Sequence, residues 1–312
     1  MAPAAVSSTP PAAEPAETTT ATTTLEENSI FRKKGGDVAN FSVGGTAAGG
    51  GSTVPRIPDF ASKEEERLYV KQRLAGAFRV FAANGFDEGL SGHMSMRDPI
   101  DPHTFWINPY SMHFADIKVS DLVRVTEDAE VVHGHHAVNA AGFAIHSEIH
   151  QAHPWINAVC HAHSTAGKAW SVFGEPLPPL TQDSLKFHGG HTAVLHEYHG
   201  PVVTTAEGQA IAGVIGDDTN VVVLRNHGIL SVGATIDEAC YWFLSFDRSC
   251  QAQLMVDAAV AGGRGGGKAP REIDEETAMQ AAKMLGARQR GWLHFQPYYT
   301  NMLEKTNGAF LQ

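Results

Sequence analysis

Cysteines, basic residues and long apolar runs are all scarce in this sequence. Its 312 residues include 3 cysteines, too few for a disulfide framework, which favours a reducing, cytoplasmic location. No stretch of 18 consecutive apolar residues occurs, so the sequence predicts no membrane-spanning helix. Lys and Arg number 23 against 34 Asp and Glu, and the net charge of −11 argues against nucleic acid or an anionic membrane surface as a partner.

The first 53 residues have the composition of a disordered tail. Ala, Thr, Pro and Ser dominate the segment, and such residues bury too little apolar surface to offset chain entropy. It has neither the basic start nor the apolar core of a signal peptide, and it ends in the glycine-rich stretch VGGTAAGGGST. We therefore expect a low-complexity tail over 1–53 and one folded domain over 54–312.

The remainder alternates between helical and strand-like patterns, which predicts an α/β domain with a sheet covered by helices. Ser62 is suited to cap a helix that ends near Gly85, because three acidic residues follow it in the first turn. Thr235 is suited to cap a second, long helix. We expect a last helix near 271–290, followed by an aromatic extension. Strand-like runs occupy 93–98, 104–108, 122–126, 155–163 and 220–226.

The chain has 17 histidines, and 13 of them lie between His133 and His227. His161 and His163 follow an apolar run in WINAVCHAH, and residues i and i+2 of a strand share one face. Both imidazoles could therefore bind one metal ion, which is a common role of this side chain. The same spacing also fits two hydrogen-bonded histidines on a half-polar face, so the pair alone leaves both interpretations open.

A third histidine lies directly after another buried strand. His227 follows VVVLRN and precedes Gly228, which would let the backbone turn tightly. If the two strands lie close together, His227 completes a three-histidine site with His161 and His163. Three neutral nitrogens leave at least one coordination position open, as a catalytic metal requires.

A competing pair lies in HSEIH, within a predicted helix over 140–152. His146 and His150 are spaced i, i+4 and so share one helix face, with Glu148 between them. The glutamate is misplaced for a zinc-binding helix of the H-E-x-x-H type. We therefore interpret the two histidines as a pair on the helix surface and expect His150→Ala to leave metal content unchanged.

Three segments together resemble the class II aldolase/adducin family: AAGFAIHSEIHQAHPWINAVCHAHSTAGKAWS, EYHGP and VVVLRNHGILSVGATIDEACYWF. The upstream LSGHMSMRD and FWINPY fall where that family has its substrate loops. The resemblance covers roughly residues 60–290. It implies a three-layer α/β/α sandwich around a mostly antiparallel sheet, and ring-shaped homotetramers. It also implies a divalent metal held by His161, His163 and His227, with zinc as the favoured ion and iron as the alternative.

Departures from the family pattern weaken a strict sugar-phosphate aldolase prediction. An ungapped count back from His161 places Gly142 where those aldolases have an acid/base glutamate, and glycine cannot move a proton. Glu148 lies six residues further on, about 9 Å along a helix axis. The phosphate-binding segments also differ, since His93 stands in place of an asparagine and Ala140-Ala141 in place of a hydroxyl pair.

Three functions therefore stay open. The first is a metal-dependent, lyase-like enzyme that cleaves or rearranges a carbon–carbon bond beside a carbonyl or hydroxyl of a small substrate. The second is an actin-binding protein resembling the adducin head, and the third is a three-histidine iron oxygenase or decarboxylase. For the enzyme, the candidate proton-transfer residues are His199, His93 and Glu148, and the candidate substrate contacts are Ser91, Gly92, Asn108 and Tyr110.

Overall fold

The computed structural model describes residues 54–198, 200 and 204–312, so the predicted tail over 1–53 lies outside the described residues. We describe the unit that spans Arg56–Gln312. None of its described helices is both long and apolar enough to cross a membrane. Its helices are α3 (Lys63–Ala83), α4 (Ala140–Ala152), α5 (Thr165–Ser171), α6 (Thr205–Val214), α7 (Ile236–Ala261), α8 (Glu275–Leu285) and α9 (Arg288–Lys305), with short 3₁₀ turns at Val119–Asp121, Ser184–Phe187 and Ala309–Leu311.

The described strands form one eight-stranded sheet in the order β4-β3-β2-β1-β5-β8-β7-β6. Neighbouring strands run antiparallel except β6 and β7, which are parallel, so the sheet is mixed where a mostly antiparallel one was predicted. The strands are β1 (His93–Arg97), β2 (Thr104–Ile107), β3 (Val123–Thr126), β4 (Val131–His133), β5 (Ala158–Ala162), β6 (Thr192–Leu195), β7 (Val221–Leu224) and β8 (Gly228–Gly233).

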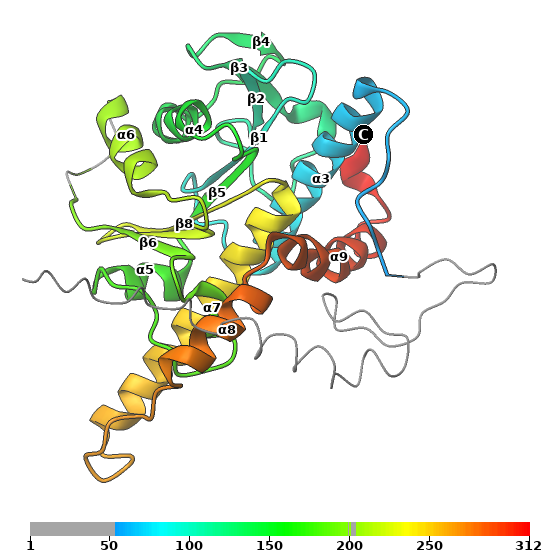
Figure 1. Cartoon of the computed structure of the whole chain (residues 1–312). Helices are drawn as coiled ribbons and strands as arrows, with labels where there is room; N and C mark the ends of the chain where they lie inside the picture. The colour runs from blue at the N-terminus through cyan, green and yellow to red at the C-terminus, as the bar shows by residue number, and fades with distance from the viewer. Residues whose placement is uncertain (1–53, 199, 201–203) are drawn as a thin grey trace, which may run out of the picture. The chain divides into compact units, whose positions relative to one another are not determined.

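Helices cover both faces of this sheet, which confirms the three-layer α/β/α sandwich (Figure 1). Alternation along β7 shows how the sequence builds it. Val221 and Val223 pack into the core shared with α3, α7 and α9, while Val222 and Leu224 pack with Ile149 of α4 and its neighbours from α6. Because successive strand residues point to opposite faces, one all-apolar strand serves both cores.

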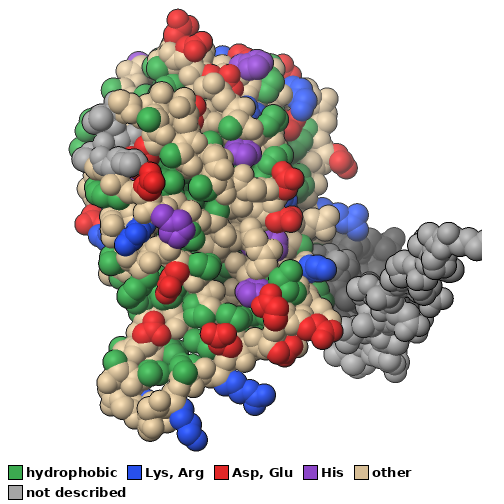
Figure 2. All heavy atoms as spheres, turned by 60° about the vertical axis from the view of Figure 1, so that its left-hand side comes forward, with side chains coloured by type: hydrophobic (Ala, Val, Ile, Leu, Met, Phe, Trp, Pro, Cys, Tyr) green, Lys and Arg blue, Asp and Glu red, His purple; other side chains and the backbone are tan. Residues whose placement is uncertain are grey.

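The predicted helix starts are confirmed. The side chain of Ser62 accepts a hydrogen bond from the backbone N–H of Glu65, and Thr235 accepts one from Glu238 in the same way. Acidic side chains are spread among apolar ones over the face in Figure 2, in keeping with the negative charge of the sequence.

The C-terminal extension differs from the sequence prediction. Two helices, α8 and α9, replace the single helix expected near 271–290 followed by an aromatic tail. The aromatic segment is itself helical, although Pro297 lies inside it. Phe295 and Tyr299 from this segment are buried in the core shared with α3 and α7. Tertiary packing of these rings outweighs the local preference of proline to end a helix.

Candidate metal centre

Three histidines from two separate parts of the chain meet at one end of the sheet. One ring nitrogen from each of His161, His163 and His227 lies within 4.8 Å of the other two. Their ring centroids are 4.8 Å apart for His161 and His227, and 5.1 Å apart for each pair that includes His163. The structure therefore brings together the three side chains that the sequence singled out, at a spacing that one ion can bridge.

The sheet explains why these side chains converge. His161 lies in β5, His163 follows that strand, and His227 lies in the turn that joins the antiparallel strands β7 and β8. Since β5 pairs directly with β8, the turn lies against the end of β5. Asn226 holds this turn with a left-handed backbone (φ 59°), a conformation that asparagine tolerates better than most residues.

A hydrogen bond from outside the trio orients His161, and a carboxylate lies near His227. The Nδ1 of His161 lies 2.9 Å from the carbonyl oxygen of Ile229, which can only accept, so Nδ1 carries the proton and Nε2 is left available to bind a metal. The Nδ1 of His227 lies 3.7 Å from a carboxylate oxygen of Glu207 in α6. Sequence reasoning missed Glu207, because no spacing links the first turn of α6 to the N-H-G turn.

Burial keeps these imidazoles in their neutral form. It lowers the pKa of His161 far below the usual histidine range, and the neighbouring histidines lower it further. Burial also lowers the pKa of His227 to about 4 and lowers that of His163. Neutral imidazole is the form that binds metals, so the three residues fit a divalent transition metal. Three nitrogen donors suit several such ions, including zinc and iron.

A fourth histidine adjoins the trio and fills the space where a side chain at position 142 would project. His93 in β1 is paired with His161 across the sheet, and their ring centroids are 5.0 Å apart. A Cβ atom built on Gly142 would lie 2.6 Å from Cγ and Cδ2 of His93, closer than real carbon atoms approach. Gly142 in α4 is therefore what allows the imidazole of His93 to occupy this place.

The surface interpretation of His146 and His150 is wrong. Both side chains are buried, with exposed fractions of 0% and 1%. His146 Nε2 lies 2.7 Å from His93 Nδ1, and His150 Nε2 lies 2.8 Å from the hydroxyl of Ser95. Their polar partners lie on β1, about 50 positions earlier in the chain, where no i, i+4 helix pattern could reveal them.

A family model for the class II aldolase and adducin N-terminal domain matches residues 72–254. The chain belongs to the class II aldolase and adducin family. The match spans the sheet and all four histidines of the site, so the resemblance inferred from H-x-H and N-H-G is confirmed.

Two curated relatives and one solved structure in this family are close in sequence. The chain is 40% identical over 250 residues to "Decarboxylase NovR" of Streptomyces niveus, covering 80% of this chain and 89% of the relative. It is 40% identical over 250 residues to "4-hydroxy-3-prenylphenylpyruvate oxygenase/4-hydroxy-3-prenylbenzoate synthase" of Streptomyces roseochromogenus subsp. oscitans, covering 80% and 87%. The structure titled "L-fuculose 1-phosphate aldolase from Glaciozyma antarctica PI12" is 39% identical, with a TM-score of 0.74, covering 82% and 96%.

The residues predicted to contact substrate differ in their burial and in their distance from the three histidines. Gly92 has φ +119°, and a Cβ there would lie 3.2 Å from the carbonyl oxygen of His161, so Ser91-Gly92 runs close to the strand that carries His161. Asn108 accepts a 3.3 Å hydrogen bond from the backbone of Met94 and is buried. Tyr110 is 44% exposed. His199 lies outside the described residues.

Glu148 and Tyr198 differ in how they lie relative to the three histidines. Glu148 packs against Gly208 of α6 and lines a cavity between α4 and α6; none of the hydrogen bonds described for the chain joins it to the trio. Tyr198 lies beside the trio, with its ring centroid 6.5 Å from that of His227, and is 48% exposed. Sequence reasoning missed Tyr198, although it directly precedes the candidate His199 in EYHGP.

Proposed function

We propose that this chain is a metal-dependent enzyme that breaks a carbon–carbon bond beside a carbonyl group of a small oxygenated substrate. The observation that carries the proposal is the convergence of three neutral histidines, His161, His163 and His227, with one nitrogen of each within 4.8 Å of the others. A divalent metal bound there would supply Lewis-acid polarisation of a carbonyl or hydroxyl oxygen of the substrate.

We assign proton transfer and substrate contacts to side chains around the trio. His93 adjoins His161 and is neutral, since burial lowers its pKa far below the usual value, so one of its ring nitrogens keeps a free lone pair. We propose this nitrogen as the group that accepts a hydrogen bond or a proton from the substrate. We propose His93 ahead of Glu148, which packs against α6. Ser91, Asn108 and Tyr110 are proposed as substrate contacts, together with the backbone at Gly92, and His199 as a further proton-transfer group.

For the substrate class, we propose a 2-oxo acid that loses CO₂. Two relatives at 40% identity carry the words decarboxylase and oxygenase in their names, and the second name specifies a phenylpyruvate. The glycine at position 142 supports this choice over a sugar phosphate, since no carboxylate can project there while His93 occupies the space. Iron is the corresponding metal, and dioxygen would be the co-substrate. As the C1–C2 bond breaks, C1 leaves as CO₂, one oxygen atom of O₂ completes a new carboxylate at C2, and the other becomes a hydroxyl group on the carbon next to it.

A second candidate is retro-aldol cleavage with zinc, which the solved structure at 39% identity favours by its title. The purified chain, loaded separately with Fe²⁺ and Zn²⁺, distinguishes the two candidates. We expect O₂ uptake and CO₂ release with the iron form and 4-hydroxyphenylpyruvate. Release of an aldehyde from L-fuculose 1-phosphate by the zinc form alone would favour the aldolase instead. His161→Ala should abolish whichever activity appears.

The adducin-like reading is tested separately, because adducin shares the family. Co-sedimentation with actin filaments at micromolar protein should leave this chain in the supernatant. Pelleting with filaments, combined with no turnover of either substrate class, would replace the enzyme proposal. We further propose a homotetramer in the cytoplasm, and light scattering of the purified chain gives its mass directly.

A further inference from the structure

A row of buried polar side chains leads from the metal centre into the layer between β1 and α4. We name His93, His146, Ser95 and His150 the polar chain. His93 Nδ1 lies 2.7 Å from His146 Nε2, and His146 Nδ1 lies 2.6 Å from the Ser95 hydroxyl. That hydroxyl lies 2.8 Å from His150 Nε2, and His150 Nδ1 lies 3.2 Å from the carbonyl oxygen of Ile156. Each of the four side chains is at most 5% exposed.

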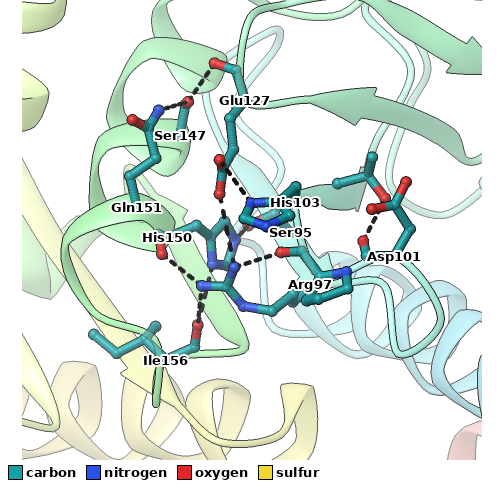
Figure 3. A network of polar contacts seen from close by, with 11 residues as sticks. Ser95, Arg97, Asp101, His103, Glu127, Ser147, His150, Gln151 and Ile156 are labelled. Carbon is teal, nitrogen blue, oxygen red and sulfur yellow. Dashed lines mark hydrogen bonds and ion pairs between the residues drawn. The ribbon is translucent and has the colours of Figure 1, made fainter.

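At the outer end of the polar chain, the donor and the acceptor of each hydrogen bond can be assigned. Figure 3 shows His150, Ile156 and Arg97 at this end. A carbonyl oxygen can only accept hydrogen bonds, so His150 Nδ1 must donate to Ile156. Arg97 also donates to that oxygen, over 3.2 Å, and to the carbonyl of His150, over 2.6 Å. Burial of the ring, and to a lesser extent this guanidinium, lowers the pKa of His150 to about 3. A neutral His150 with its proton on Nδ1 leaves Nε2 as an acceptor.

This assignment then fixes the donor and the acceptor in each of the remaining hydrogen bonds of the polar chain. Ser95 must donate its hydroxyl proton to His150 Nε2 and accept from His146 Nδ1. Burial lowers the pKa of His146 far below the usual range, so this ring is neutral and its Nε2 is an acceptor. His93 must therefore donate from Nδ1 to His146. The nitrogen left over is His93 Nε2, which no hydrogen bond among the described residues uses.

We propose that Ser95, His146 and His150 are positioning residues that hold His93 in its Nδ1–H tautomer and so present an unprotonated Nε2 at the metal centre. Which nitrogen of a histidine carries the proton is set by the hydrogen bond that the other nitrogen makes. The role of this nitrogen as a base rests on the proposed function. The tautomer itself does not, because it follows from one carbonyl oxygen, four hydrogen bonds and the neutral, buried rings of His146 and His150.

The tautomers are measured directly by ¹⁵N–¹H correlation of histidine rings in the zinc-loaded protein, which is diamagnetic. We expect His93, His146 and His150 all to show Nδ1 protonated and Nε2 unprotonated, with signals assigned by single histidine substitutions. Observation of His93 with its proton on Nε2 would overturn the proposal, whether or not the protein turns over any substrate.

A matched pair of serine variants tests whether the tautomer is transmitted. Ser95→Ala removes the central link, whereas Ser147→Ala removes a buried hydroxyl that bonds Glu127 and Gln151 outside the polar chain. We expect Ser95→Ala to give His93 a mixture of tautomers and to lower kcat about 10- to 100-fold with KM and bound zinc or iron unchanged. Ser147→Ala should change neither the tautomer of His93 nor kcat. If Ser95→Ala left the His93 tautomer pure, Ser95 would not be a positioning residue.

If neither substrate class is turned over, the proposed function fails while the tautomer measurement still decides the polar chain. If turnover is found but His93 carries its proton on Nε2, the enzyme stands and the positioning role falls. Ser95→Thr keeps the hydroxyl and should restore the single tautomer. A mixture in Ser95→Thr, in a variant that unfolds at the same temperature as the parent, would count against the proposal.

Discussion

At His161, one ring nitrogen donates a hydrogen bond within the protein and the other remains available to bind a metal. The bond from Nδ1 to the carbonyl of Ile229 fixes both the tautomer and the direction of the ring. His227 has the carboxylate of Glu207 beside its own Nδ1. The hydrogen bond at His161 would raise the basicity of this imidazole toward a metal and holds the ring in place, so binding would not have to order it.

Loss of one histidine from the trio should therefore remove most bound metal, because two nitrogens make a poor site. We expect His161→Ala to lower metal per chain from near 1 to below about 0.2, as measured by elemental mass spectrometry on protein purified without chelators or a histidine tag. His150→Ala should keep its metal, since His150 lies at the far end of the polar chain. His103→Ala, on an 84% exposed side chain, is the surface control. Equal losses in all three variants would contradict the ligand assignment.

The contact between Gly142 and His93 gives a prediction about stability. Gly142→Ala would place a methyl group 2.6 Å from the ring of His93, so we expect the free energy of unfolding to fall by about 1–3 kcal/mol. Gly213→Ala is the matched control in α6, where nothing lies within 4 Å of the new Cβ. That variant should be neutral or more stable by up to about 1 kcal/mol. Urea unfolding curves compare the two, and equal midpoints would show that the ring moves aside without cost.

At the scale of elements, β1 shows how one short strand serves two purposes. Met94 and Met96 face the core formed with α3 and α7, while His93 and Ser95 face α4 and hold the polar chain. The alternation of apolar and polar residues in HMSMR is a normal half-buried strand pattern. Its polar side is buried here because α4 covers it with histidines instead of leaving it to solvent.

The turn between β7 and β8 gives a prediction at this scale. Asn226 adopts a left-handed backbone, which costs alanine roughly 1–2 kcal/mol more than glycine. We expect Asn226→Ala to lower the free energy of unfolding by about 1 kcal/mol and to weaken zinc binding, because the turn carries His227. Asn226→Gly should leave both nearly unchanged. Calorimetric titration with zinc and thermal unfolding of the two variants provide the measurement, and similar losses in both would assign the effect to the amide side chain instead.

Local sequence patterns predicted the helices and strands better than they predicted which distant residues these elements contact. The caps at Ser62 and Thr235, the strand before His227 and the family itself could all be inferred from short stretches of sequence. The burial of His146 and His150 could not, because the groups that satisfy them lie on β1 and not on their own helix. Helix α9 was missed for the same reason: its packing against α3 and α7, and not its local sequence, holds Pro297 in a helix.

At the scale of the whole molecule, the buried histidines make the fold sensitive to acid. Histidines in the unfolded chain take up protons below about pH 6.5, while burial keeps His93, His146 and His150 neutral to much lower pH. The unfolded state then binds more protons, so stability falls as pH decreases below 6.5. Between its two pKa values, each such histidine contributes up to about 1.4 kcal/mol per pH unit.

We therefore expect the unfolding temperature of the metal-free protein to drop steeply between pH 7 and pH 5. The variant His150→Gln should show a shallower drop than the parent, because one buried group that resists protonation is gone, although its stability at pH 7 is lower. His103→Gln, on the exposed surface, should follow the parent curve. Differential scanning calorimetry at several pH values measures the slopes, and identical slopes for His150→Gln and the parent would remove His150 from this account.

The close approach of position 142 to His93 also constrains how this protein could have diverged. A glutamate at 142 and an imidazole at 93 compete for one volume, since even a Cβ at 142 would overlap the ring. An ancestor that carried the glutamate could gain His93 only together with its loss, and either substitution alone would leave a crowded or an empty site. The two positions should therefore be inherited as a linked pair, and family members should separate into a lineage with the carboxylate and a lineage with the histidine.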